Sequence, residues 1–224
     1  MKKTKLLSAL VFVLAAALLL GACSVKLGGE ETWEYTAEDK KGSDELFHNF
    51  FEKTFSNTNQ VITVTGDGSE VFVETIDGTS DHVKYEENKA ETYSFIRDGV
   101  YTYAMTGETD NYYVEGEKIY NTGYFVYRRN IDIFEMLPDT GLTYSCKVNG
   151  SAKDGKSTST LTFVIDGGES GVVTITATAA DDLVNEITAV REQGGKKATT
   201  IMKIAYGSAS VTVPDITGWI KEDY

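Results

Sequence analysis

Residues 142–149, LTYSCKVN, alternate apolar and polar side chains without a break. Successive side chains of a β-strand point to opposite faces of a sheet, so the apolar members of this stretch share one face. The same two-residue period returns at residues 160–165 and 173–179. The three stretches predict antiparallel strands with one buried and one solvent-facing surface.

Similar runs extend this pattern in both directions from residues 142–149. Turns separate them, and the strongest is Asp98-Gly99, where glycine tolerates the positive φ of a two-residue hairpin turn. Short turns favour antiparallel neighbours, so we expect a meander that grows in sequence order. The further expected strands lie near residues 60–65, 70–77, 81–86, 90–97, 100–106, 111–115, 118–127, 182–192, 198–206 and 211–213.

Two segments show helical periodicity instead. Residues 44–55, DELFHNFFEKTF, carry an aromatic stripe, with Ser43 or Asp44 available as the N-cap. A stripe of this kind is typical of a core-facing helix, and contact of Phe47 and Phe51 with a ligand is the alternative. A second short helix is expected at residues 128–137, before Pro138.

These elements predict a mainly β (α+β) fold. About ten to twelve strands are too many for a flat open sheet, which tends to curl or split. We expect one domain over residues 44–216, a strongly curved antiparallel meander or unclosed barrel. The N-terminal and mid-chain helices would pack on its concave side, and residues 217–224 would form a C-terminal tail.

The first 23 residues, MKKTKLLSALVFVLAAALLLGAC, place a basic segment before an apolar run and small residues before Cys23. The apolar run is short for a transmembrane helix, which needs about twenty residues. The stretch resembles a bacterial lipoprotein signal, with residues 20–23, LGAC, as its lipobox. The resemblance implies removal of residues 1–22 and lipid attachment at Cys23. The protein would then be exported and anchored to the cell membrane, facing the outside or the periplasm.

Residues 24–43 are polar, charged and glycine-containing. This composition is typical of a flexible tether, so residues 23–43 are expected to link the lipid to the domain. Trp33 and Tyr35 leave an alternative open, because an alternating aromatic pair can dock on the domain as an edge strand.

The net charge of −13 becomes −16 when the three lysines of residues 1–22 are lost with the leader. This charge disfavours nucleic acid as a partner and repels anionic lipid headgroups. The membrane contact is therefore expected through the acylated Cys23. Cys146 then has no second cysteine for an intramolecular disulfide, and its place on an apolar strand face predicts a buried, unreactive thiol.

The order of elements resembles that of periplasmic lipoprotein carriers and lipid-carrying cell-surface lipoproteins, whose fold is an unclosed barrel. The resemblance rests on a helix, a meander with turns like RDGVY at residues 97–101, a mid-chain helix, and DLVNEI and VTVPD at residues 182–187 and 211–215. It implies an apolar cavity between sheet and helices that receives acyl chains.

Catalytic signatures of hydrolases, zinc proteases and nucleotide-binding enzymes are missing from the sequence. Its two histidines, His48 and His82, favour neither a triad nor a multi-histidine metal site, and no cofactor is expected. We expect no enzyme, although paired carboxylates for glycoside hydrolysis stay open because their separation depends on the fold.

Tyrosines cluster in the middle third of the chain, where strand propensity explains most of them. Their apolar bodies and polar tips also suit a ligand surface or a protein interface. The expected function is binding of a lipid or other apolar ligand in the hollow of the sheet, and the alternative is an envelope protein-interaction module without a cavity. The candidate contacts are Phe47, Phe51, Tyr93, Phe95, Tyr101, Tyr103, Tyr112 and Tyr113.

Overall fold

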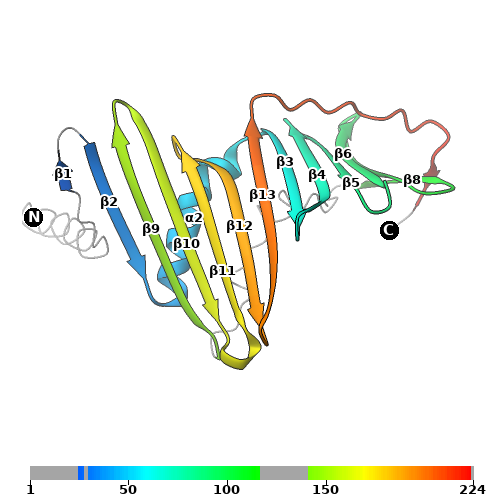
Figure 1. Ribbon diagram of the computed structural model, residues 1–224. Coiled ribbons are helices and arrows are strands. Elements are labelled where there is room, and N and C mark those ends of the chain that lie inside the picture. The colour runs from blue at the N-terminus through cyan, green and yellow to red at the C-terminus, as the bar shows by residue number, and fades with distance from the viewer. Residues whose placement is uncertain (1–24, 28–29, 117–140, 223–224) are drawn as a thin grey trace, which may run out of the picture.

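A computed structural model describes residues 25–27, 30–116 and 141–222. They form one fourteen-stranded sheet and one α-helix, α2 (Lys40–Ser56). Figure 1 shows how these elements are arranged. The strands are β1 (Val25–Leu27), β2 (Glu30–Ala37), β3 (Asn59–Gly66), β4 (Ser69–Asp77), β5 (Ser80–Tyr85), β6 (Glu91–Arg97), β7 (Val100–Thr106), β8 (Asn111–Gly116), β9 (Thr143–Lys153), β10 (Lys156–Asp166), β11 (Val172–Ala180), β12 (Leu183–Gln193), β13 (Lys196–Tyr206) and β14 (Ile220–Lys221).

The sheet combines two meanders, β3 to β8 and β9 to β13. Strand β13 pairs with β3, and β2 adds to β9, so growth in strict sequence order is wrong at these two junctions. All pairs are antiparallel except β14, which lies parallel to β8. Strands β1 and β14 end the sheet and do not pair with each other, so the mainly β, unclosed architecture expected from the sequence is confirmed.

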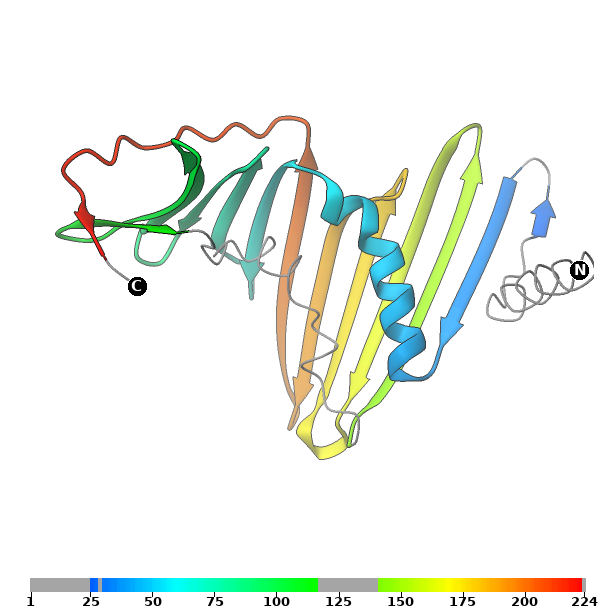
Figure 2. The ribbon, with the colours of Figure 1, turned by 180° about the vertical axis from the view of Figure 1, so that it is seen from behind.

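The alternation predicted for the long strands is confirmed. Tyr144, Cys146 and Val148 of β9 are buried on one face, together with Leu161 and Phe163 of β10. Helix α2 covers this face, lying across the long strands in Figure 2. Phe47 and Phe51 of the helix are buried there, so the core-facing reading of the aromatic stripe is correct.

Helix α2 begins earlier than expected. Its N-cap is Asp39, whose Oδ1 accepts a hydrogen bond from the Gly42 amide at 2.8 Å, rather than Ser43 or Asp44. Near its other end the buried Thr54 Oγ1 accepts from the Val184 amide of β12 at 2.8 Å. These contacts fix both ends of the helix.

The tether expected over residues 23–43 is wrong at residues 25–27, which form β1, and from residue 30 onward. Residues 30–37 form β2, which pairs with β9 along its length. Ladder hydrogen bonds and a Glu34–Lys147 ion pair of 3.0 Å on the outer face stabilise a strand that composition alone disfavours. Trp33 and Tyr35 point to the helix side, so this stretch docks on the domain as the alternative proposed, although β1 rather than β2 is the edge strand.

The strand expected at residues 211–213 is also wrong. Residues 208–216 are extended without a ladder partner, and side chains hold them instead. Asn59 exchanges two hydrogen bonds of 3.0 Å with the backbone of Ala209, and Ile216 is buried against the sheet. The expected tail then pairs with β8 through β14. The strand at 118–127, the helix at 128–137 and Cys23 lie outside the described residues.

Two hydrophobic clusters lie on opposite faces of the sheet. The larger cluster lies between α2 and the long strands and extends over β3 to β5. The smaller one contains Phe95, Ala104 and Ile216. The register from β5 to β7 places Phe95 and Ala104 on the face opposite to Val83 of the larger cluster. The prediction of one buried face therefore holds for the long strands and reverses at β6 to β8.

Candidate functional site

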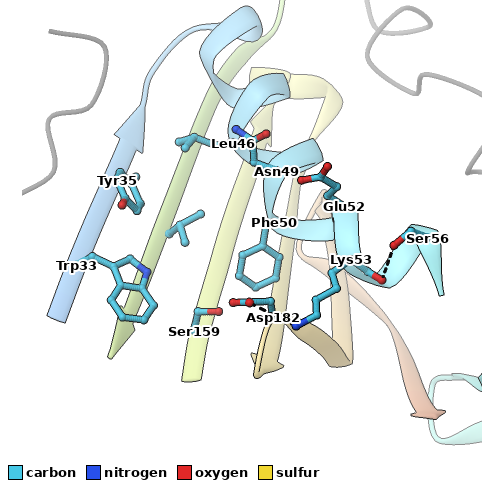
Figure 3. Close-up of a pocket in the computed structure, with 11 residues that line it drawn as sticks. Trp33, Tyr35, Leu46, Asn49, Phe50, Glu52, Lys53, Ser56, Ser159 and Asp182 are labelled. Carbon is cyan, nitrogen blue, oxygen red and sulfur yellow. Dashed lines mark hydrogen bonds and ion pairs between the residues drawn. The ribbon is translucent and has the colours of Figure 1, made fainter. Parts of the chain in front are cut away.

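A pocket of about 640 Å³ opens between α2 and the edge of the sheet (Figure 3). Strands β2, β9 and β10 form its floor, and the exposed side of α2 forms one wall. The lining residues are Trp33, Tyr35, Leu46, Asn49, Phe50, Glu52, Lys53, Ser56, Val148, Ser159 and Asp182. This size lies within the range of small-molecule sites.

One row of paired residues makes most of the floor. Trp33 of β2 pairs with Gly150 of β9, which pairs with Ser159 of β10. A Cβ atom on Gly150 would lie 2.2 Å from the Trp33 ring, so only glycine lets the indole lie across β9. The indole therefore reaches from β2 towards the middle of the pocket.

Apolar groups surround the indole. Tyr35 pairs with the buried Val148 one step along the same face. From the helix, Leu46 and Phe50 are partly buried against the larger cluster, and the Phe50 ring lies 5.5 Å from that of Phe51. The pocket is therefore an incompletely filled margin of the core, where apolar side chains remain accessible to a bound molecule.

Charged groups lie only at the rim. Lys53 Nζ donates to the Asp181 carbonyl at 2.8 Å and lies 3.6 Å from Asp182 Oδ2. Asp182 is 72% exposed, so this ion pair contributes little to stability. An apolar interior with a polar rim suits an amphiphilic ligand.

The aromatic candidates from the helix lie beneath this pocket rather than in it. Phe51 is 1% exposed, and its ring centroid lies 4.5 Å from that of Phe47. Phe47 in turn lies 6.0 Å from Phe163 of β10. These residues hold α2 on the sheet, and the residues next to them in the helix line the pocket.

The tyrosine-rich candidates lie at the other end of the sheet and divide between its two faces. Phe95 is buried, with Tyr93 and Tyr113 packed around it beneath the C-terminal segment. Tyr101, Tyr103 and Tyr112 lie on the opposite face, as the β7–β8 register shows. The structure therefore does not bring them together with Phe47 and Phe51.

Four apolar side chains on the same face as Tyr112 have exposed fractions of 39% to 49%. We call these residues, Ile96, Tyr101, Met105 and Ile220, the β7 patch. Ile96 pairs with Tyr101, and both Met105 and Ile220 pair with Tyr112, so all four lie on one face of the sheet.

A polar cluster lies at β5 and β6, on the face that the C-terminal segment covers. The His82 ring stacks on Tyr93 with centroids 4.5 Å apart, and its Nε2 lies 3.4 Å from Glu91 Oε2. The Tyr93 hydroxyl donates to the same carboxylate oxygen. Partial burial, followed by this carboxylate, raises the pKa of Tyr93 above its ordinary value.

Cys146 lies in the core of β9 and is 1% exposed. Burial raises the pKa of its thiol to about 12. The thiol is therefore protonated at neutral pH and unreactive, as its place on the apolar strand face indicates.

The pocket residues carried only a partial signal in the sequence. The Trp33 and Tyr35 alternation marks an edge strand, but the charged residues around it favour a tether. Gly150 had no recognisable signal, because its role depends on the pairing of β2 with β9. Pairing between strands more than a hundred residues apart is not encoded in local periodicity.

No family model matches the chain, and no curated protein or solved structure matches it either. Over the described ranges, no helix has the length and apolar character needed to cross a membrane. The same ranges hold no cluster of three or more histidine, cysteine or acidic residues suited to a metal ion.

Proposed function

We propose that the protein is a membrane-anchored lipoprotein of the cell envelope that binds an apolar or amphiphilic ligand between α2 and the edge of the sheet. The pocket carries this proposal. Its interior presents Trp33, Tyr35, Phe50 and Val148, and its charged groups lie at the rim. The acylated Cys23 would hold the domain on the membrane.

The strongly acidic body supports a role in binding rather than in tight contact with anionic lipid. With a net charge of −13 before loss of the leader, the domain is repelled by anionic headgroups. An apolar tail can still enter the pocket, because burial of each methylene contributes about 0.8 kcal/mol. The ligand is therefore expected to be neutral or zwitterionic with at least one hydrocarbon chain.

The first test is titration of residues 23–224 carrying Cys23→Ser with a neutral fluorescent monoacylglycerol. We expect saturable binding at one site. Ser159→Phe should weaken it about tenfold or more, because the new ring occupies the floor beside Trp33. Thr160→Phe is the matched control, since Thr160 is the next residue of β10 and faces the other side.

A second variant tests the floor itself. Gly150→Ala places a methyl group where the Trp33 ring lies, so the indole must move. We expect weaker probe binding with an unchanged far-ultraviolet circular dichroism spectrum. Equal binding by the parent, Ser159→Phe and Gly150→Ala would contradict the pocket as the ligand site.

The β7 patch favours a second candidate function, an envelope protein-interaction module. Exposed apolar side chains gathered on one face are typical of interaction sites. A photo-crosslinker placed at Tyr101 in intact cells should give one discrete adduct that Met105→Glu abolishes. The same crosslinker at Thr176, on the polar face of the long strands, is the control. Identical adducts at both positions would contradict this function.

A further inference from the structure

The N-terminal hairpin returns the chain towards the pocket. Strand β1 runs antiparallel to β2, with Val25 opposite Thr32 and Leu27 opposite Glu30. Thr32 immediately precedes Trp33, which lies on the pocket floor. Val25, the first described residue, therefore lies beside the strand that carries Trp33, next to Thr32 and not at the start of β2.

The position of Cys23 follows from chain length. It is two positions before Val25, and a chain spans at most about 7 Å over two residues. A group attached to the Cys23 sulfur therefore originates close to β2, the strand that carries Trp33 and Tyr35. A flexible acyl chain attached there reaches the pocket without displacement of any strand.

We propose that, away from a bilayer, the pocket holds the protein's own lipid, an acyl chain of the diacylglyceryl group on Cys23. This inference rests on the proposed function, because it needs both the lipidated cysteine and an apolar site. The ligand is then part of the same molecule, and the domain covers an acyl chain of its own membrane anchor.

Charge supports this occupant over an anionic phospholipid. A diacylglyceryl thioether carries no phosphate, so no anionic group has to lie at a rim that contains Glu52 and Asp182. Lys53 is the rim's cation, and it is already engaged by Asp182 and by the Asp181 carbonyl. An anionic headgroup would therefore meet uncompensated negative charge.

The covalent link between the lipid and the domain also supports this occupant. A group linked through a short flexible chain has an effective concentration of about a millimolar at a nearby site. A free lipid present at micromolar concentration competes poorly with it. A bilayer competes well, because it accepts both acyl chains, and we expect the anchor to leave the pocket on membrane contact.

The test compares the full lipidated protein with residues 23–224 carrying Cys23→Ser, both with Trp219→Phe. The chain contains two tryptophans, so Trp33 becomes the only one. In detergent-free monomer fractions, we expect acrylamide to quench Trp33 about twofold less in the lipidated protein, because a bound chain covers the ring. Neutral phosphatidylcholine vesicles should restore the quenching seen with Cys23→Ser.

A second readout does not depend on Trp219→Phe. The fluorescent monoacylglycerol should bind the Cys23→Ser protein and bind the lipidated monomer about tenfold more weakly, owing to the tethered competitor. Equal binding by the two would overturn the inference and leave the proposed function standing. No binding by the Cys23→Ser protein would overturn the proposed function itself, and protection of Trp33 only in oligomers would overturn the inference.

Discussion

The long strands and the short strands of the same sheet are stabilised in different ways. Over β9 to β13, helix α2 covers one face, and the large cluster beneath it includes Phe51 and Phe163 with almost no exposed surface. Over β6 to β8, an extended C-terminal segment covers the other face, with Ile216 as its one buried side chain. A continuous backbone ladder thus joins two regions whose apolar burial differs greatly in extent.

This difference indicates that the two regions do not share one stability. Regions with few buried apolar contacts open at lower free energy than the core of the same protein. The short-stranded end should therefore open locally while the helix-covered end remains folded. The reversal of the buried face at β6 also means that a change in one cluster does not directly contact the other.

The largest expected effect is on the helix-covered region. Phe163→Ala should lower the free energy of unfolding by about 3–5 kcal/mol, because Phe163 is fully buried and lies against Phe47 of α2. Urea denaturation of residues 23–224 measures this change. Val164→Ala, on the other face of the same strand, is the control and should cost less than about 1.5 kcal/mol. Equal losses from the two variants would contradict the assignment of the core face.

A smaller and local effect is expected at the other end. Ile216→Ala should cost about 2–3 kcal/mol of local stability, since the side chain fills the centre of a small cluster. Amide hydrogen exchange should accelerate in β6 to β8 and stay unchanged in β9 to β13. Val213→Ala, at a 42% exposed position of the same segment, should leave both unchanged. Equal acceleration across the sheet would show that the two regions unfold as one unit.

The two regions should lose stability at alkaline pH through different titrating groups, Cys146 in the helix-covered region and Tyr93 in β6. The folded protein retains the Cys146 proton up to about pH 12, whereas the unfolded chain loses it near 9.0, so stability falls as pH rises above 9. The raised pKa of Tyr93 adds a similar decline that begins near 10.0. Cys146→Ala should remove the first decline and Tyr93→Phe the second, measured by urea denaturation and by exchange in β6. A decline unchanged in both variants would contradict these assignments.

The smallest expected effect concerns the pairing of β2 with β9 in the helix-covered region. Lys147→Ala removes the 3.0 Å ion pair with Glu34, in which both side chains are about half exposed. The loss should be under about 1 kcal/mol and should shrink in 1 M salt, as for surface ion pairs in general. A loss of several kcal/mol would mean that β2 depends on this pair rather than on its ladder with β9.

The sequence was most informative where local pattern and tertiary packing agree. Alternation at residues 142–149 predicted the buried face of β9. Asp98-Gly99 predicted the hairpin between β6 and β7, in which both turn residues have positive φ. The helix stripe predicted the burial of Phe47 and Phe51. In each case a period of two or 3.6 residues is the direct result of backbone geometry.

The errors fall where distant strands meet. Residues 30–37 are charged enough to suggest a tether, and pairing with β9 makes them a strand. Residues 211–213 have the composition of a strand, but the side chain of Asn59 and the burial of Ile216 hold the segment without a ladder. The pocket was unpredictable in detail for the same reason, since Trp33, Gly150 and Ser159 come from three strands. Their meeting depends on long-range register, which a single sequence does not display.

Strands β1 and β14 stand at opposite ends of the sheet, so Val25 and Lys221 are separated by nearly its whole width. At about 4.8 Å between neighbouring strands, fourteen strands measure some 60 Å along the curved backbone. A protein anchored through Cys23 would carry the β7 patch at the end of the sheet away from its anchor. A fluorescent protein fused after Tyr224 should consequently show little energy transfer to dyes in the outermost lipid layer.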